Sequence, residues 1–502
     1  MSDLRRLAAG VMCAGFDGVR VGGDLEALLR DLPPAGAILF GGNIESVAQT
    51  RELTGALRGI DPELIIAIDQ EGGRVARIRA GVEEIPSMLA IGAANDPELA
   101  EAAGTQVAFD LRRAGVNLDF APVLDLTLFR LNTVIGTRAF GDDPERVAEL
   151  AGAFARGLEA GGVVPTLKHF PGHGSTAVDS HLDLPAIDLD EATLRARDLI
   201  PFAKLLPNAP AVMTAHIVAR AFDRDRPATI SYRILTELLR DELHFAGVCF
   251  TDCLQMDAIA KGVGSERAAV EALAAGADCV LISRDLELTK RVALAIARAV
   301  ETGQLSRERL EEAHGRVSRL RSQLRSPLPL DAAAPFAGIG ETIGRRAVTL
   351  LRGEAHADAS ACVVVSFESP TVEGVQGKHE HHAALAEFVA IEEIRLPLEP
   401  ETPSVESVLE RTRGKRPIVL MRRAHVYPKQ RLAVERILDA HRDAMLVSLR
   451  EPFDAFDFPQ ASTVLCTYGD DRPSLAGLAA VLFDGAPAQG VFPLHGVPVA
   501  GS

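Results

Sequence analysis

Long apolar runs and blocks of basic residues are both missing from this chain of 502 residues. No stretch reaches the roughly 18 apolar residues that a membrane-spanning helix requires. Residues 1–18 lack the apolar core of a signal peptide, so we expect a cytoplasmic protein with no membrane partner. The net charge is −16. Because phosphate-backbone binding needs clustered Lys and Arg, a nucleic-acid partner is not expected.

Tryptophan is absent and tyrosine occurs three times, so we do not expect a broad aromatic platform. Cysteine is also scarce, with six residues scattered along the chain. Cys249 and Cys253 are four positions apart, but no second pair completes a zinc site. Most of the cysteines stand within apolar runs, which predicts buried, reduced thiols.

The chain does contain a series of short apolar segments, each followed by a stretch with helical periodicity. Eight of them occupy residues 11–18, 36–42, 64–73, 117–126, 163–172, 211–217, 247–256 and 279–285. They are apolar without clean alternation, which is typical of strands buried on both faces of a parallel sheet. Eight β-then-α units over about 320 residues predict a (β/α)8 TIM-type barrel.

A second α/β unit is expected after the barrel. The Pro- and Ala-rich stretch SPLPLDAAAPFAG predicts a linker, and five further apolar segments with helical stretches between them predict a small open sheet. We therefore expect a catalytic barrel over residues 1–325, a linker over 326–340 and a C-terminal domain of unknown role over 341–502. The histidine run GKHEHHAAL (377–385) is interpreted as an exposed helix start, with metal binding as the alternative.

Polar side chains stand at the end of nearly every barrel segment. They are Asp69, Glu71, Asp125, Lys168, His169, His216, Asp252, Arg284 and Asp285. Barrel active sites form where the carboxyl ends of the strands meet, so this pattern predicts an active site there.

The stretch KHFPGHGSTAVDSHLDLP (168–185) is the part of the chain densest in titratable groups, and a metal site, a catalytic loop and a plain polar loop are all conceivable. Pro171, Gly172 and Gly174 interrupt any helix, so His169 and His173 do not share a helical face as metal ligands. We predict no metal. Glycine hinges at the end of a barrel strand favour a catalytic loop that closes over a substrate.

Four motifs in this sequence resemble those of the glycoside hydrolase family 3 β-N-acetylhexosaminidases, specifically the bacterial β-N-acetylglucosaminidase branch in its two-domain form. The loop at 168–185 resembles the signature loop of that branch. AIDQEGGRVARIR (67–79), IGTRAFGDDPERV (135–147) and GVCFTDCLQMDAI (247–259) are similar to its other motifs, in the same order. The resemblance covers roughly residues 5–325, and the C-terminal domain only loosely resembles the family's accessory domain.

The resemblance implies glycoside cleavage with retention, which uses a carboxylate nucleophile and a group that acts first as acid and then as base. Asp252 matches the nucleophile, and its other interpretation is a helix N-cap. His181, oriented by Asp179, matches the acid/base. An imidazole titrates near neutral pH, and a carboxylate partner fixes its tautomer. Asp183 is a competing candidate for the partner or acid.

The resemblance also implies that several residues hold the hydroxyl groups of a terminal sugar. These are Asp69, Arg138, Lys168 and His169. Charge-assisted hydrogen bonds suit a polyhydroxylated ligand. For Arg138 and Lys168 a surface ion pair is the alternative. His173 is interpreted as shaping the loop, and His216 receives no role.

Three functions follow as candidates. The first is a retaining exo-β-N-acetylglucosaminidase that cleaves short muropeptide or chitin fragments through a covalent glycosyl-aspartate. The second is a phosphorylase in which phosphate attacks the same intermediate. The third is a catalytically silent, sugar-binding barrel. The lack of an aromatic platform favours a short substrate with one enclosed sugar. No cofactor is expected, and the sequence leaves the aglycone and the oligomeric state open.

Overall fold

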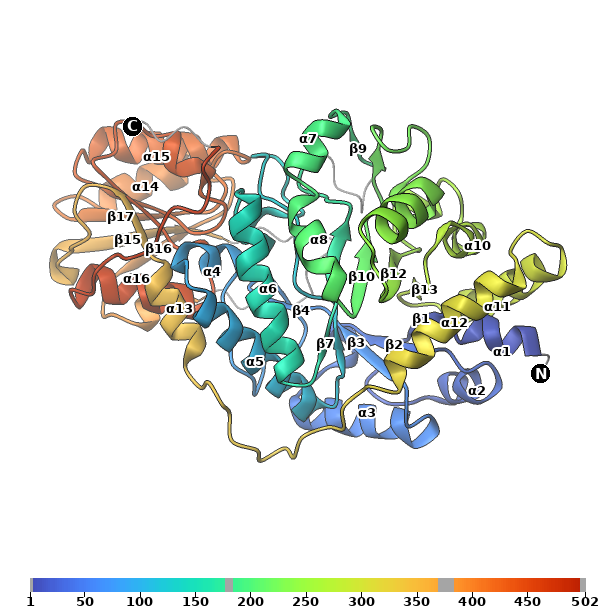
Figure 1. Cartoon of the computed structure of the whole chain (residues 1–502). Helices are drawn as coiled ribbons and strands as arrows, with labels where there is room; N and C mark the ends of the chain where they lie inside the picture. The colour runs from blue at the N-terminus through green and yellow to red at the C-terminus, as the bar shows by residue number, and fades with distance from the viewer. Residues whose placement is uncertain (1–2, 177–183, 369–382, 497–502) are drawn as a thin grey trace.

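The N-terminal part of the protein is a parallel barrel. The computed structural model describes residues 3–176, 184–368 and 383–496 (Figure 1). The barrel strands are β1 (Met12–Gly15), β2 (Gly36–Leu39), β3 (Ile65–Ile68), β6 (Leu118–Asp119), β7 (Val164–Pro165), β8 (Leu167–Phe170), β10 (Ala211–Thr214), β12 (Val248–Cys253) and β13 (Cys279–Ile282). Their order in the sheet is β7-β6-β3-β2-β1-β13-β12-β10-β8. Because β7 and β8 lie in one run of chain, the two ends of this sheet meet, and the predicted eight-unit barrel is confirmed.

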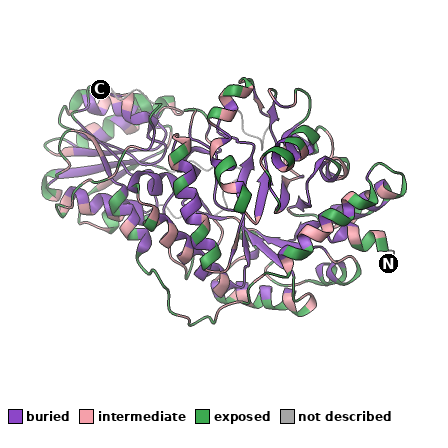
Figure 2. Ribbon diagram, viewed as in Figure 1, coloured by how far each residue is buried: buried purple, intermediate pink, exposed green. Residues whose placement is uncertain are grey.

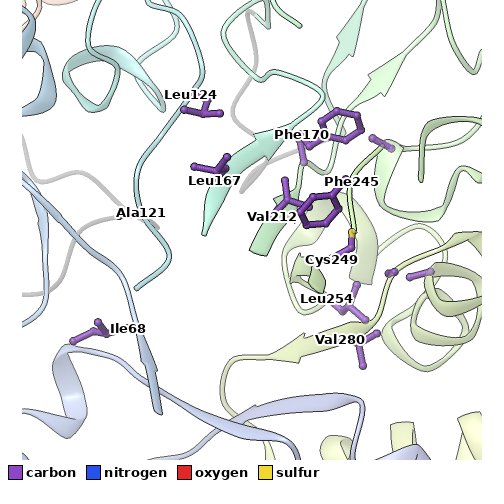
Figure 3. Packing of buried hydrophobic residues seen from close by; sticks show 14 of the residues in the cluster. Ile68, Ala121, Leu124, Leu167, Phe170, Val212, Phe245, Cys249, Leu254 and Val280 are labelled. Atoms are coloured by element: carbon purple, nitrogen blue, oxygen red, sulfur yellow. The ribbon is translucent and has the colours of Figure 1, made fainter. Parts of the chain in front are cut away.

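The strands are buried on both faces, which explains why their sequences do not alternate between apolar and polar residues. Along β3, Ile65 and Ala67 belong to the cluster that fills the barrel interior. Ile66 and Ile68 belong to the cluster that packs under the helices. Successive strand side chains point to opposite faces, so both sets must be apolar. Figure 3 shows part of this outer layer.

Helices surround the barrel, and Figure 2 shows them buried toward the strands and exposed on the other side. They include α2 (Gly23–Asp31), α3 (Val47–Ile60), α5 (Pro97–Ala114), α6 (Pro144–Ala160), α8 (Ile200–Leu205), η5 (Arg233–Glu242), α10 (Ser265–Ala275), α11 (Leu286–Glu301) and α12 (Arg307–Arg321). The starts of α5 and α6 follow directly from Asp-Pro pairs in the sequence. Asp96 and Asp143 accept hydrogen bonds from backbone N–H groups of the first turn, and proline follows each of them.

The C-terminal part contains a six-stranded sheet, one strand more than the five expected. Its order is β14 (Thr349–Arg352), β19 (Thr463–Cys466), β18 (Met445–Ser448), β17 (Arg416–Met421), β15 (Cys362–Phe367) and β16 (Glu393–Leu396). The additional strand, β14, pairs antiparallel with β19 at one edge, whereas the other pairs are parallel. The accompanying helices are α13 (Ile339–Ala347), α14 (Thr402–Arg411), α15 (Pro428–Ala440) and α16 (Arg472–Phe483).

The two parts of the chain share a hydrophobic contact. Residues 322–338, all of them described, contain neither helix nor strand and lead from α12 to α13 (Figure 1). The barrel-side helix α4 (Met88–Ala94) then contributes Leu89, Ala90 and Ala93 to the core cluster of the C-terminal sheet. The N-terminal and C-terminal units are therefore packed together through α4.

Two expectations about composition can be compared with the structure. All six cysteines are free thiols, and five of them are buried while Cys253 is partly exposed. Within the described residues, no helix combines the length and the apolar character that a membrane crossing requires.

Candidate active site

The candidate residues converge on one end of the barrel. Asp69 directly follows β3, and Asp252 lies near the end of β12. Lys168 and His169 lie in β8, which together with β7 forms the fifth strand of the barrel. Because these strands are parallel, their carboxyl ends open on the same mouth. Arg138 reaches the group from the short helix η2 (Gly136–Arg138).

A buried network of charges connects three of the strand-end residues to Arg138. The Lys168 Nζ atom lies 2.8 Å from Asp69 Oδ1 and 2.6 Å from Glu71 Oε1. Arg138 donates from Nε and Nη2 to the two Glu71 oxygens, at 2.8 and 2.7 Å. Lys168 and Glu71 are each 1% exposed. The surface ion pair considered for Arg138 and Lys168 is therefore excluded, because both are buried.

A second pair, His169 and Asp125, adjoins this network. His169 Nδ1 lies 2.6 Å from Asp125 Oδ2, and His169 Nε2 lies 3.3 Å from Arg138 Nη2. A guanidinium can only donate, so Nε2 accepts and the ring proton lies on Nδ1, directed at Asp125. Asp125 Oδ1 also accepts the backbone N–H of His173 at 2.6 Å.

The network keeps its members charged despite their burial. Burial alone would raise the pKa of Glu71, but Arg138 and Lys168 outweigh it and hold that pKa well below its usual range. Burial would lower the pKa of Lys168, and Asp69 and Glu71 reverse this and raise it. Burial would also raise the pKa of Asp125, which His169 instead lowers. A binding surface of fixed charges results, and it needs no proton uptake to form.

Asp252 is partly exposed at the mouth of the barrel. Its Oδ1 accepts the backbone N–H of Cys253 at 2.6 Å. The next helix, α9 (Asp257–Ala260), starts five residues later and has Met256 at its N-cap position. The helix N-cap interpretation of Asp252 is therefore wrong.

His216, which received no role from the sequence, lies beside this strand end. Its Nε2 donates to the carbonyl of Cys253 at 2.9 Å, and its Nδ1 lies 2.7 Å from Thr229 Oγ1. The ring is fully buried. It anchors the backbone immediately after Asp252 and so fixes the direction in which that strand ends.

The loop after the fifth strand is described only in part. His173 is buried and holds the loop through its backbone contact to Asp125, while its carbonyl accepts from Asn132 Nδ2 at 3.1 Å. Burial lowers the pKa of the His173 ring to about 4, so it is neutral at physiological pH. His181, Asp179 and Asp183 lie outside the described residues. Among the described residues, no group of His, Cys, Asp and Glu side chains is arranged to hold a metal ion.

Two organising residues, Glu71 and Asp125, were not assigned a role by the sequence analysis. Both stand among the polar strand ends, so their location was predictable. Their function was not, because each acts by facing residues distant in the sequence: Glu71 faces Arg138, and Asp125 faces His169.

The C-terminal domain approaches the segment that carries Arg138. Gly136 has a positive φ of 43°, and a Cβ built there would lie 2.2 Å from Glu451 Oε1. Glu451 is itself held by two hydrogen bonds from Arg423, each 2.7 Å long. The turn that leads into Arg138 thus packs directly against a buried ion pair of the second domain.

Comparison with known proteins decides the family. Residues 13–320 match the model of the glycosyl hydrolase family 3 N terminal domain. The chain belongs to glycosyl hydrolase family 3. The protein is therefore a glycoside hydrolase, and the four sequence motifs are motifs of its own family.

Two relatives illustrate how the similarity is distributed. A beta-hexosaminidase of Pseudomonas aeruginosa is 47% identical over 262 residues, which cover 51% of this chain and 77% of that relative. The solved structure of a family 3 beta-N-acetylglucosaminidase from Paenibacillus sp. str. FPU-7 is 32% identical, with a TM-score of 0.93 over 99% of this chain and 100% of the other. The likeness to the Paenibacillus enzyme therefore includes the C-terminal domain.

A second solved structure shares the fold at lower sequence identity. The beta-glucoside phosphorylase BglX has a TM-score of 0.81 and 20% identity, with 99% of this chain and 94% of the other covered. The two-domain architecture is thus found in proteins whose names describe different reactions.

Proposed function

We propose that this protein is a retaining exo-β-N-acetylglucosaminidase that removes terminal β-linked N-acetylglucosamine from short oligosaccharides such as muropeptide or chitin fragments. The Asp69–Lys168–Glu71–Arg138 ion-pair network, at the same mouth of the barrel as the strand-end carboxylate Asp252, is the observation that carries this proposal. The names of the Pseudomonas and Paenibacillus relatives support the substrate class. A cytoplasmic location is proposed with it.

Asp69 is the member of the network suited to contact the sugar directly. Its side chain is 17% exposed, compared with 1% for Glu71 and 2% for Lys168. Lys168 has three ammonium protons, and the contacts to Asp69 and Glu71 occupy two of them. The third proton and the Asp69 carboxylate would together bind adjacent sugar hydroxyls. Glu71 would position Lys168 and Arg138 without touching the substrate.

In the first chemical step, the Asp252 carboxylate attacks the anomeric carbon of the enclosed sugar. The bond from that carbon to the glycosidic oxygen breaks, and its electron pair stays on the oxygen. The His181 imidazolium, held by Asp179, donates a proton to that oxygen, and the aglycone leaves as an alcohol. The products are a glycosyl ester of Asp252 and a neutral His181. The roles of His181 and Asp179 rest on the family motif.

In the second step, neutral His181 removes a proton from a water molecule as the water oxygen attacks the anomeric carbon. The ester bond to Asp252 breaks, and the carboxylate takes the bonding electrons. The sugar is released with its original β configuration, because the carbon has been inverted twice. The enzyme returns to its starting protonation state.

The proposal is tested by following the products formed from nitrophenyl β-N-acetylglucosaminide with and without millimolar phosphate. Free N-acetylglucosamine under both conditions supports hydrolysis. A sugar 1-phosphate as the main product would replace hydrolysis by phosphorolysis. Faster release from the matching nitrophenyl glucoside would overturn the sugar assignment and leave the Asp252 chemistry in place.

A further inference from the structure

A histidine of the C-terminal domain lies against the barrel. His425 is in the turn between β17 and α15, and its side chain is 2% exposed. Its Nδ1 lies 2.8 Å from Asp454 Oδ1, in the same domain. Its Nε2 lies 3.1 Å from the backbone carbonyl oxygen of Arg130, in the barrel. The ring therefore bridges the two parts of the chain between two oxygen atoms.

The two oxygen atoms determine which protons the His425 ring needs in this arrangement. A carbonyl oxygen can only accept, so the contact with Arg130 requires a proton on Nε2. Asp454 is fully buried, and its second oxygen accepts the backbone N–H of Ala424 at 2.9 Å. An ionised carboxylate also only accepts, so its contact with the ring requires a proton on Nδ1. Both contacts are made together when His425 is an imidazolium, and loss of either proton breaks one of them.

The charged surroundings of His425 favour the imidazolium. The charged groups that bear on the ring, with their own ion-pair partners, are Asp454, Glu451, Arg423, Arg130 and Asp457. Burial acts to lower the pKa of His425, but the hydrogen bond and charge of Asp454, together with the charge of Glu451, outweigh it and raise that pKa. Arg130 opposes the increase, and its guanidinium is paired with Asp457.

Arg130 stands at the exposed tip of a barrel segment, residues 129–132, which we call the Arg130 loop. Phe129 and Leu131, on either side of Arg130, are 42% and 64% exposed. The Arg130 guanidinium lies 2.5 Å from Asp457 of the C-terminal domain, in addition to the carbonyl contact described above. Because its neighbours bury little surface, the tip of this loop depends on its contacts with the C-terminal domain for a fixed position.

The other end of the Arg130 loop contacts the active site. Asn132 donates from its side-chain amide to the carbonyl of His173, at 3.1 Å, and to the carbonyl of the next residue, at 3.3 Å. The N–H of His173 donates to Asp125 at 2.6 Å, and Asp125 in turn holds the ring of His169. A short series of hydrogen bonds thus runs from this loop to His169, one of the residues proposed to bind the sugar.

We propose that His425 is a positioning residue for the active site, which acts through a barrel loop rather than on the substrate. As an imidazolium it fastens the Arg130 loop to the C-terminal domain, and through Asn132 this loop holds His169 in place. The effect on activity rests on the function proposed above, whereas the contact between the domains does not. The C-terminal domain thereby takes part in a reaction that the barrel carries out.

Hydrogen exchange tests the contact without any substrate. In the full-length protein, His425→Leu should speed amide exchange in a peptide spanning 127–135 by about tenfold, because loss of a charge-assisted hydrogen bond lets the loop open. His356→Leu, at an exposed histidine of the same domain, is the control and should leave exchange unchanged. Equal exchange in the two variants would overturn the proposal.

The pH dependence of the same exchange tests the charge on His425. Because its pKa is raised in the folded protein, the imidazolium is fully present below the ordinary value near 6.5 and is lost as pH rises through the raised pKa. Exchange in 127–135, corrected for its intrinsic rate, should therefore be faster at pH 9 than at pH 6. Asp454→Asn should stay protected at both, since its amide can donate to Nδ1 of a neutral ring whose Nε2 keeps the proton for Arg130. A pH response that persists in Asp454→Asn, or its absence from the unaltered protein, would overturn the proposal.

The connection to the active site is tested with nitrophenyl β-N-acetylglucosaminide at pH 6. In His425→Leu, kcat/KM should fall about tenfold, because a small displacement of a binding group is costly for catalysis. Asn132→Asp should show the same loss, since it keeps the shape of the side chain and removes the donor of the two carbonyl contacts. Asp454→Asn and the control His356→Leu should retain normal activity.

The two kinds of measurement separate the possible failures. Normal kcat/KM in both His425→Leu and Asn132→Asp would overturn the positioning role. Asn132→Asp leaves the C-terminal domain unaltered, so it decides the question if His425→Leu does not fold. An unaltered protein that is inactive on this substrate would refute the proposed function, and the exchange measurements would still decide whether His425 fastens the Arg130 loop.

Discussion

Asp252 stands at the end of β12 with one carboxylate oxygen bound to the Cys253 N–H and the side chain partly exposed. We expect Asp252→Ala to lower kcat by several powers of ten and to leave Tm nearly unchanged, because covalent catalysis is lost without loss of packing. Asp257→Ala, in the next helix, is the control and should retain activity. An Asp252→Ala enzyme with more than about a tenth of normal activity would contradict the nucleophile assignment.

The acid/base role of His181 predicts a dependence on the leaving group. His181→Ala should lose roughly 10²–10⁴-fold in rate on substrates with alcohol leaving groups. It should lose much less in the first step on nitrophenyl substrates, because a nitrophenolate departs without a proton. Pre-steady-state release of nitrophenol measures that step, and Asp179→Asn should change the rates in the same direction. Equal losses on both kinds of substrate would mean that His181 has a structural role only.

Glu71 is predicted to contribute stability that a surface carboxylate cannot. In Glu71→Gln the buried Lys168 and Arg138 lose their shared counter-charge, which should reduce the free energy of unfolding by about 3–5 kcal/mol. Glu101, which pairs with Arg156 on the surface, is the matched control. Glu101→Gln should cost at most about 1 kcal/mol. Urea unfolding curves that show equal costs for the two variants would refute a structural role for the network.

At the level of single elements, β6 contains a buried carboxyl that should make stability depend on pH. Burial raises the pKa of Asp119 to about 8, whereas in the unfolded chain an aspartate titrates near pH 4. Between these values the folded state binds more protons, so stability falls as pH rises through this window.

Asp119→Asn tests this contribution, because it keeps an oxygen that can accept the Gln70 N–H, now 2.9 Å from Asp119 Oδ1. The slope of unfolding free energy against pH, measured at pH 5, 6 and 7, should become less negative by up to about 1.4 kcal/mol per pH unit. The exposed Asp188→Asn should leave the slope as it is. An unchanged slope in Asp119→Asn would show that Asp119 is ionised in the folded protein.

The elements that could be predicted from the sequence are those buried on both sides. Most barrel strands lie in mainly apolar segments whose polar residues gather at the carboxyl ends, and the Asp-Pro helix starts are local signals. The antiparallel strand β14 was missed because TLLR is short and the strand pairs at the edge of its sheet, where only one of its four residues is fully buried.

The candidate site was predictable in its location, and less so in its contacts. Strand-end polarity indicated Asp69, Lys168 and Asp252, and the family motifs added Arg138. The pairing of Glu71 with Arg138 was not predictable, because it joins positions 67 residues apart through a loop whose path depends on the rest of the fold. The close approach of Glu451 to Gly136 was not predictable for the same reason, since the two residues are far apart in the sequence.

For the whole molecule, the division into a barrel ending near residue 325 and a C-terminal domain beginning near 341 remains a proposal, and truncation tests it. A chain ending at 325 would expose Leu89, Ala90 and Ala93, which α4 now buries against the C-terminal sheet. We expect this chain to aggregate in size-exclusion chromatography. Leu89→Gln in the same truncated chain should restore part of the soluble yield. A truncated barrel that is monomeric with the full-length Tm would show that the two units fold independently.

The approach of Glu451 to Gly136 links two distant positions of the gene. Any side chain at position 136 would occupy the space that the Glu451 carboxylate takes, and the backbone there has a positive φ. Substitutions at 136 and 451 are therefore not independent, and their effects should not add. A chimaera that gives this barrel the C-terminal domain of a distant homologue would inherit a mismatch two residues before Arg138. Engineers who recombine such enzymes must transfer the 136–451 pair as one unit.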